Sequence, residues 1–235
     1  MNIIKPFSKS WKSFVQLIYP NLCFLCGDGL VKGESGICIG CDASLPKTLY
    51  WEYNNNPIYN SMHARCGIEH ASAYLFFQKQ NKVQKIMHRF KYHGDKILGM
   101  EMGRRFGLRL KEVDLLADVD VVMAIPLHIS KQMQRGFNQS EILAEGIAQS
   151  LRKKTDFKAL KRNIANSSQT TKNRIERWEN VESIFSVNIP KSVSGKHILL
   201  IDDVFTTGAT MEACIEAIQK ANANKISIAT LAVSD

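Results

Sequence analysis

The chain has 235 residues, of which 45% are hydrophobic, and a formal net charge of +9 at pH 7. This length accommodates one full domain and a small module, and the apolar fraction supports a packed core. No window reaches the ~18 apolar residues of a membrane-spanning helix, and the first twenty residues lack the features of a signal peptide. We therefore expect a cytoplasmic protein without membrane insertion. Its charge favours polyanions or phosphorylated ligands, although solubility alone would also explain it.

The N-terminal part of the chain combines a predicted helix with four cysteines. Residues 11–18 place apolar side chains on one helical face, and Pro20 helps to end the helix. Two Cys-x-x-Cys pairs follow, separated by eleven residues: Cys23, Cys26, Cys38 and Cys41. Two such turns close a tetrahedral site of four sulfurs, and disulfides are the weaker explanation in a cytoplasmic protein. We predict a structural zinc site, with an iron–sulfur cluster or a redox pair as the alternatives.

The two other cysteines are not expected to bind metal. Cys214 falls on the apolar face of a predicted helix and is therefore expected in the core. Cys66 is flanked by His63 and His70, but this spacing fits no zinc pattern, so we treat both histidines as non-ligands.

A polar stretch with two prolines, residues 45–60, is predicted to be a linker. We expect it to separate two domains. The first, residues 1–50, holds the N-terminal helix and the zinc module. The second, residues 51–235, holds the remainder of the chain.

Beyond this stretch the pattern predicts a strand near residues 73–77 and then two helices, residues 83–90 and 98–110. The basic face of the first helix ends at Arg89 and Lys91. Both side chains could reach a pyrophosphate group, and a solvated helix face is the alternative, more so for Arg89 than for Lys91.

A second buried strand is predicted over residues 119–125, ended by Pro126. The following segment, residues 135–139, places a cation, a glycine, an aromatic residue and two amides in five positions. This composition is typical of a binding loop, and it begins with Arg135. A helix should come next, capped by Asn138 or Ser140. The final strand is predicted over residues 226–233.

The most informative stretch is residues 196–214. Four apolar residues, 198–201, suit a strand buried on both faces, and Asp202 and Asp203 follow where that strand should end. Open α/β sheets bind ligands at this edge. A loop of small and hydroxyl residues then leads into a helix, whose free N–H groups attract an anion. The acids suit sugar hydroxyls or Mg²⁺, so a ligand with a phosphate beside a vicinal diol fits both halves.

This stretch resembles the 5-phosphoribosyl 1-pyrophosphate (PRPP) signature of type I phosphoribosyltransferases. The resemblance implies that the unit binds the ribose hydroxyls and the 5′-phosphate of PRPP through seven residues: Asp202, Asp203, Thr206, Thr207, Gly208, Ala209 and Thr210. Gly208 would let the backbone approach the phosphate closely. An ordinary strand–turn–helix with surface acids is the alternative, but adjacent acids at the end of a buried strand are costly unless something uses them.

The order of motifs along nearly the whole chain is similar to that of the ComF family of competence-associated phosphoribosyltransferase-like proteins. These motifs are the four cysteines, then FKYHGD, IPLH, RGFNQ and IDDVFTTGAT. The resemblance implies an α/β fold, in which a mostly parallel sheet is flanked by helices and a small four-cysteine zinc module precedes it. It also places Lys91 and Arg135 at the pyrophosphate end of PRPP, with Mg²⁺.

The resemblance further implies a mobile hood over residues 162–185, with Gln169, Arg174 and Arg177 as candidates, although a solvated surface helix would look the same. The expected function is PRPP-dependent phosphoribosyl transfer linked to DNA uptake. The alternative is a non-catalytic accessory protein that binds single-stranded DNA or DNA-uptake proteins and keeps the PRPP site as a ligand sensor. No residue pattern identifies an acceptor pocket or a catalytic base.

Overall fold

The computed structural model describes residues 21–78, 81–92, 94–163 and 184–234. The chain divides into two compact units, Met1–Leu45 and Pro46–Asp235. The domain limits expected from the sequence stay a prediction. Among the described residues, no helix is both long enough and apolar enough to cross a membrane.

The first unit holds the four cysteines in a short irregular segment. Isolated β-bridges join Leu22 to Gly29 and Ser35 to Ile37, and helix α2, Ile39–Ala43, follows. Cys38 caps this helix, because its sulfur accepts a hydrogen bond from the backbone N–H of Cys41 at 3.3 Å. Contacts to cysteine sulfur atoms hold this segment together, and it buries few apolar side chains.

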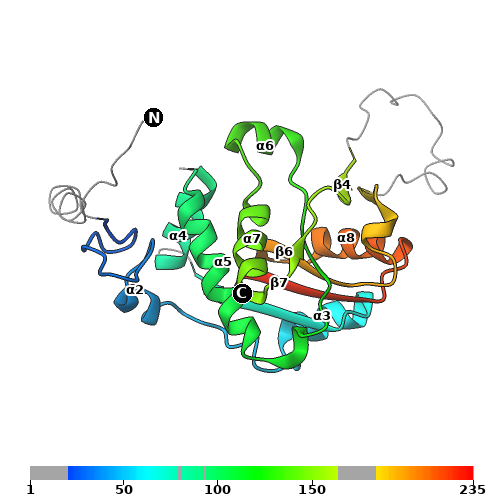
Figure 1. The fold of residues 1–235 in the computed structure, drawn as a ribbon, viewed down its shortest axis with the longest axis horizontal. Helices are drawn as coiled ribbons and strands as arrows, with labels where there is room; N and C mark the ends of the chain where they lie inside the picture. The colour runs from blue at the N-terminus through cyan, green and yellow to red at the C-terminus, as the bar shows by residue number, and fades with distance from the viewer. Residues whose placement is uncertain (1–20, 79–80, 93, 164–183, 235) are drawn as a thin grey trace, which may run out of the picture. The chain divides into compact units, whose positions relative to one another are not determined.

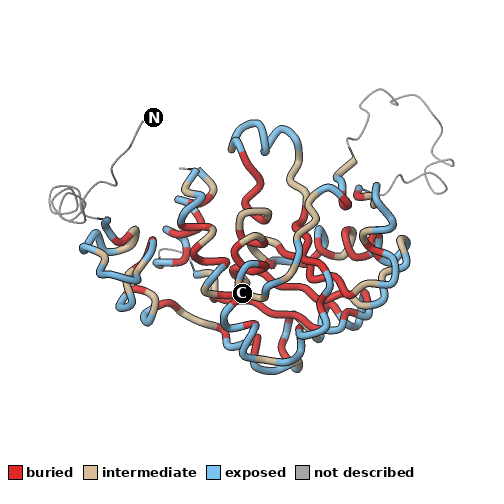
Figure 2. The backbone as a smooth tube through the Cα atoms, viewed as in Figure 1, coloured by how far each residue is buried: buried red, intermediate tan, exposed pale blue. Residues whose placement is uncertain are grey.

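The second unit is built on a five-stranded sheet in the order β1-β7-β6-β2-β3, and each neighbouring pair is parallel. Its strands are β1 His70–Phe77, β2 Val121–Ala124, β3 Lys154–Thr155, β6 His197–Phe205 and β7 Lys225–Ser234 (Figure 1). The central strand β6 carries the apolar run at residues 198–201, and all four side chains are fully buried (Figure 2). This confirms the predicted α/β fold with a parallel sheet.

Helices flank this sheet. They are α3 Pro57–Cys66, α4 Lys82–Tyr92, α5 Lys96–Lys111, α7 Gln139–Leu151 and α8 Ala209–Lys220, whereas the short helix α6 Ile129–Arg135 has no buried residue. Two 3₁₀ turns, Asp114–Leu116 and Pro190–Ser192, and an antiparallel pair, β4 Leu160–Arg162 with β5 Phe185–Val187, complete the described unit. Helices α5 and α7 touch backbone to backbone, because a Cβ at Gly103 would lie 2.4 Å from the carbonyl oxygen of Leu143.

The predicted linker over residues 45–60 is wrong for its last residues, which begin helix α3. Asn56 caps this helix, since its Oδ1 accepts a hydrogen bond from the N–H of Tyr59 at 3.0 Å, and Pro57 occupies the first turn. Ile58 and Met62 are buried against the sheet. Tertiary packing of two apolar side chains therefore outweighs a polar local composition. The helix expected over residues 11–18 and the hood candidates Gln169, Arg174 and Arg177 lie outside the described residues.

Candidate functional site

Strand β6 carries the two acids at the carboxyl edge of the sheet. The strand does not end at Ile201 but continues through both acids to Phe205. Asp202 Oδ1 accepts hydrogen bonds from Ser140 Oγ at 2.9 Å and from the backbone N–H of Asp203 at 2.8 Å. Burial, followed by the negative charge of Asp203, raises the pKa of Asp202 to about 7. A carboxyl group in this position is costly to ionise until a cation or donor reaches it.

Asp203 has a cation beside it. Lys91 Nζ, in the last turn of α4, lies 2.7 Å from Asp203 Oδ2. The sequence analysis placed Lys91 at the pyrophosphate end of a ligand; in this structure its ammonium group instead lies against the acid pair. One ammonium group faces two adjacent carboxyl groups, so the pair keeps capacity for a further cation or for hydroxyl donors.

The loop formed by residues 206–210, the 206–210 loop, leads from β6 into α8. Gly208 is the residue before the helix and has φ of 79°, a conformation that glycine adopts without strain. No side chain caps α8 at Gly208. The N–H of Ala209 donates to Thr207 Oγ1 at 3.4 Å, and the next N–H groups of the first turn, at Thr210 and Met211, are the ones available to an anion. Thr206, Thr207 and Thr210 are exposed around this helix start.

Gly208 also has a role in packing. A Cβ on this residue would lie 2.8 Å from Met62 Sδ and 2.9 Å from both Arg65 Nη2 and the Phe205 ring. The glycine therefore allows α3 to pack against the loop, in addition to supplying the positive φ. The sequence analysis considered only its approach to a ligand.

Arg135 ends helix α6 close to the start of α7. Its Nη1 donates to Gln139 Oε1 at 2.9 Å, and its guanidinium carbon lies 5.8 Å from the centre of the Tyr92 ring. Gln139 directly precedes Ser140, which contacts Asp202. Arg135 is thus connected to the acid pair through the first turn of α7.

Two buried polar atoms around the acid pair have no hydrogen-bond partner: Gln139 Nε2 and Thr230 Oγ1. Thr230 lies on β7 directly opposite Asp202 in the strand register. Gln139 occupies the first turn of α7, one residue before Ser140. Buried donors without partners are uncommon in folded proteins, and their presence beside two carboxyl groups is typical of a binding site.

Sequence reasoning missed Ser140, Tyr92 and Arg65. Ser140 was considered only as a helix cap, a role that Asn138 fills, since Asn138 Oδ1 accepts from the Ser140 N–H at 3.1 Å. Arg65 donates from Nη2 to the carbonyl oxygen of Thr207 at 3.2 Å, across 142 residues of sequence. No local pattern signals such a contact. The candidates Asp202, Asp203 and Lys91 do lie together, and the 206–210 loop follows directly on β6.

The four cysteines of the first unit also lie together. The sulfur atoms of Cys23, Cys26, Cys38 and Cys41 are all within 4.8 Å of one another. The backbone N–H of Cys38 donates to the sulfur of Cys23 at 3.3 Å. Although burial raises it, the pKa of Cys23 is lowered to about 6 by the backbone N–H groups around it. Four converging sulfurs with one stabilised thiolate could hold a zinc ion.

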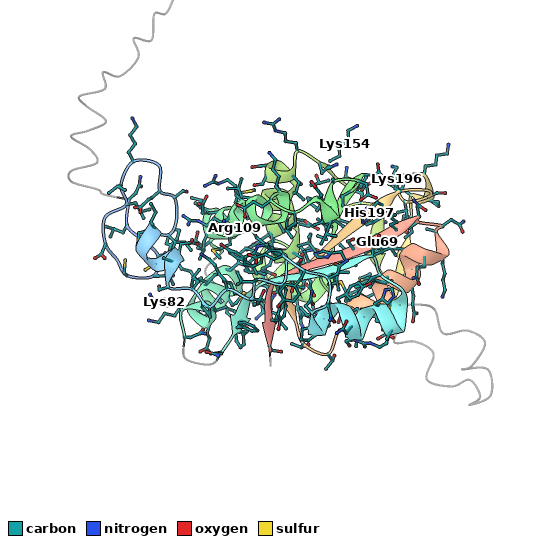
Figure 3. All side chains as sticks on the ribbon, turned by 90° about the horizontal axis from the view of Figure 1, so that it is seen from below. Glu69, Lys82, Arg109, Lys154, Lys196 and His197 are labelled. Carbon is teal, nitrogen blue, oxygen red and sulfur yellow. The ribbon has the colours of Figure 1, made fainter. Side chains whose placement is uncertain are left out.

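A second polar cluster lies at the opposite, amino end of the sheet, where Figure 3 labels His197 and Glu69. Asp118 Oδ1 lies 2.7 Å from His197 Nδ1, and His197 Nε2 lies 2.8 Å from Ser227 Oγ. The order of these groups is that of a hydrolase triad, but Ser227 is fully buried within β7 and no substrate could reach its hydroxyl. This cluster holds strands together and is not a catalytic site.

Comparison with known proteins identifies a family for part of the second unit. Residues 138–234 match the model of the phosphoribosyl transferase domain family. This segment includes Ser140, both acids of β6 and the 206–210 loop, whereas Arg65 and Lys91 lie before it. The chain is 26% identical over 217 residues to the DNA utilization protein YhgH of Escherichia coli, covering 83% of this chain and 89% of that protein.

Over 234 residues the chain is 28% identical to the competence protein ComFC of Bacillus subtilis, covering 97% of this chain and 86% of that protein. Among solved structures, the allosteric regulatory enzyme of purine biosynthesis is similar with a TM-score of 0.45 and 16% identity. That similarity covers 61% of this chain and spans 29% of the enzyme's chain.

Proposed function

The chain belongs to the ComF/YhgH family, with a phosphoribosyltransferase domain and an N-terminal four-cysteine cluster, and from this premise we propose that it binds PRPP with Mg²⁺ at the carboxyl end of β6. One observation carries the proposal. Two adjacent carboxyl groups, one of them 2.7 Å from the Lys91 ammonium group, stand directly before a glycine loop and the start of a helix. This order of groups matches the order of ribose hydroxyls and 5′-phosphate in PRPP.

In this proposal Asp202 and Asp203 bind the 2′- and 3′-hydroxyl groups of the ribose, directly or through the metal ion. The backbone N–H groups and threonine hydroxyls of the 206–210 loop bind the 5′-phosphate, which fixes the orientation of the ring. Ser140 keeps the Asp202 carboxyl in place through the 2.9 Å hydrogen bond. Mg²⁺, when bound with the ligand, would neutralise charge on the pyrophosphate.

Lys91 and Arg135 serve the pyrophosphate end. Lys91 is bonded to Asp203 in the structure, so it would have to exchange the carboxylate for a pyrophosphate oxygen when the metal and the ribose reach the acids. Arg135 lies beside Gln139, whose Nε2 lacks a partner, and both groups can donate to an anion. The reaction that this site supports is displacement of pyrophosphate from the anomeric carbon of the ribose by an acceptor nucleophile.

The four-cysteine module is proposed to hold one zinc ion without an open coordination position, so the metal stabilises structure and does no chemistry. Zinc binding contributes on the order of 10–16 kcal/mol in small modules, and Cys38→Ser should therefore unfold the first unit. Elemental analysis of protein purified without oxygen should give one zinc per chain, and its absence from such protein would contradict the proposal. Two relatives are named for competence and DNA utilization, and we propose that this chain serves a related process, in the cytoplasm.

A second function, binding of single-stranded DNA, is favoured by one surface. The Tyr92 ring is 62% exposed, has the His88 ring 4.9 Å away and is faced by the Arg135 guanidinium. Exposed aromatic rings among cations are what unpaired bases stack on. This surface adjoins the acid pair through Lys91, the neighbour of Tyr92. It also shares Arg135 with the proposed pyrophosphate end, so DNA and PRPP would compete for this residue.

Calorimetry with PRPP and Mg²⁺ tests the first function, and fluorescence anisotropy with labelled single-stranded DNA at rising salt tests the second. Binding of PRPP that Asp202→Asn abolishes supports the site. DNA affinity that falls steeply with salt, and further in Tyr92→Ala, supports the second surface. Absence of PRPP binding with intact DNA binding would make the chain an accessory protein rather than a transferase.

A further inference from the structure

Arg65 connects helix α3 to the proposed phosphate site from outside the segment that the family model matches. Its Nη2 donates to the carbonyl oxygen of Thr207 at 3.2 Å. Its Nη1 donates to Glu212 Oε2 at 2.7 Å, in the first turn of α8. One guanidinium group thus contacts both the 206–210 loop and the helix that the loop begins.

The guanidinium group of Arg65 is also held by hydrogen bonds within its own helix, α3. Nε donates to the carbonyl oxygen of Ser61 at 3.2 Å, and Nη2 donates to Ser61 Oγ at 2.9 Å. Glu212 then completes the ion pair from the other side. The guanidinium group is planar and is already held by two hydrogen bonds to Ser61 and one to Glu212. It therefore loses little conformational freedom on binding the Thr207 carbonyl oxygen, and this contact is well defined.

The contact determines which way the loop faces. The Thr207 carbonyl oxygen is directed to α3, and a Cβ on Gly208 would point to the same side, 2.9 Å from Arg65 Nη2. The N–H groups at the start of α8 point along the helix axis away from the helix. With the carbonyl oxygen occupied by Arg65, the loop presents donors rather than acceptors to an anion.

The charge of Arg65 matters as well. Glu212 places a carboxylate in the first turn of α8, where it would repel a phosphate group bound at the helix start. The ion pair at 2.7 Å neutralises that carboxylate. Both side chains are about one-third exposed, so solvent screens part of this effect.

We propose that Arg65 is a positioning residue for the 5′-phosphate: it holds the 206–210 loop with its N–H groups outward and cancels the charge of Glu212. This inference rests on the proposed binding of a phosphoribosyl ligand. It adds that the phosphate site is completed by a helix far away in sequence. Arg65 itself does not touch the phosphate.

The test compares Arg65→Met with wild type in calorimetry with ribose 5-phosphate, PRPP–Mg²⁺ and pyrophosphate–Mg²⁺. Loss of a charged hydrogen bond at a partly exposed group should weaken the first two ligands roughly tenfold. Pyrophosphate–Mg²⁺, which lacks the 5′-phosphate, should bind unchanged. Hydrogen exchange of the amides at residues 207–211 should become faster. Glu212→Gln, which removes the repulsion but leaves Arg65 in place, should keep or improve the affinity for ribose 5-phosphate.

Arg109→Met is the matched control, because Arg109 on α5 forms an exposed ion pair with Glu112, the residue after that helix, and its replacement should change none of these quantities. If Arg65→Met binds ribose 5-phosphate as well as wild type, or exchanges its loop amides at the wild-type rate, the inference is wrong. If wild type binds neither phosphoribosyl ligand, the proposed function fails, and amide exchange alone then decides whether Arg65 holds the loop. Arg65→Lys, with an intermediate effect expected, replaces Arg65→Met if the latter does not fold.

Discussion

Acidic and hydroxyl side chains lie at both ends of the parallel sheet. Those at the amino end have hydrogen-bond or ion-pair partners, whereas some buried polar groups at the carboxyl end have none. At the amino end Asp118 has two partners, His197 at 2.7 Å and Lys225 at 2.9 Å. Asp120 accepts a hydrogen bond from the backbone N–H of His197 at 2.9 Å. The hydrogen bond from Lys225 is the main cause that lowers the pKa of Asp118, against partial burial, which raises it.

At the carboxyl end only Asp203 of the two acids forms an ion pair, with Lys91, the pKa of Asp202 is raised, and Thr230 Oγ1 and Gln139 Nε2 lack partners. This difference distinguishes a cluster that stabilises the fold from one that can bind a ligand. A polar cluster whose members are all paired stabilises the fold, whereas one that remains incomplete is stabilised by a ligand. Residue type alone would have assigned a catalytic role to the wrong end, where Ser, His and Asp stand in line.

The largest effect should follow from removing the charge of the carboxyl end. In an Asp202→Asn, Asp203→Asn double variant, PRPP binding should fall more than about a hundredfold, because two charged contacts are lost. The free energy of unfolding should change little, since replacing Asp202, which is costly to ionise, by a neutral group of equal size offsets the loss of the ion pair between Asp203 and Lys91. Calorimetry and denaturant unfolding measure the two quantities. Wild-type affinity in this variant would remove the basis for the site.

The converse change at the amino end should affect only stability. His197→Phe leaves Asp118 and Ser227 each without the histidine partner, which should lower the free energy of unfolding by about 2–4 kcal/mol. Urea unfolding measures this loss. PRPP affinity, measured well below the unfolding transition, should equal that of wild type. A specific loss of ligand binding would mean that the amino end is not purely structural.

Stability should also depend on pH through the amino end. Burial, with a contribution from His197, lowers the pKa of His70 from 6.5 to about 4. The unfolded chain therefore takes up a proton at a higher pH than the folded chain does. Folding stability from this group is complete above about pH 6.5 and is lost as the pH falls toward 4, by about 1.4 kcal/mol per pH unit.

Asp202 titrates with the opposite sign in the same pH range, because its raised pKa favours the protonated folded state at low pH. The informative quantity is therefore the difference between wild type and His70→Gln in unfolding free energy at pH 7.5 and pH 5.5. Wild type should lose more stability than the variant on acidification. Equal losses would show that His70 is accessible to protons in the folded protein.

The smallest of these effects concerns Lys91. Lys91→Met removes the ammonium group from Asp203, so Mg²⁺ should bind the ligand-free site several-fold more tightly, since the acids are no longer neutralised. PRPP–Mg²⁺ should bind roughly tenfold more weakly, because a cation for the pyrophosphate is lost. Calorimetry with each ligand shows whether the two effects have opposite signs. Changes in the same direction would mean that Lys91 does not exchange partners.

Much of the fold could be predicted from the sequence because its signals are local. Four apolar residues in a row at 198–201 can be buried on both faces only in a central strand, and they form β6. The spacing of the cysteines brings four sulfurs within reach of one ion. The acids, the loop and the start of α8 are contiguous in the chain, so the sequence alone places them next to one another.

The partners of these groups were decided only by tertiary structure. Lys91 reaches Asp203 across 112 residues, Ser140 reaches Asp202 across 62, and Arg65 reaches Thr207 across 142. No periodicity or spacing encodes such contacts, because they depend on how α3, α4 and α7 pack on the sheet. Burial likewise depends on the whole fold: it raises the pKa of Asp202 and places Ser227 beyond the reach of any substrate. The sequence determined which groups are available for chemistry, and packing determined which of them remain unpaired.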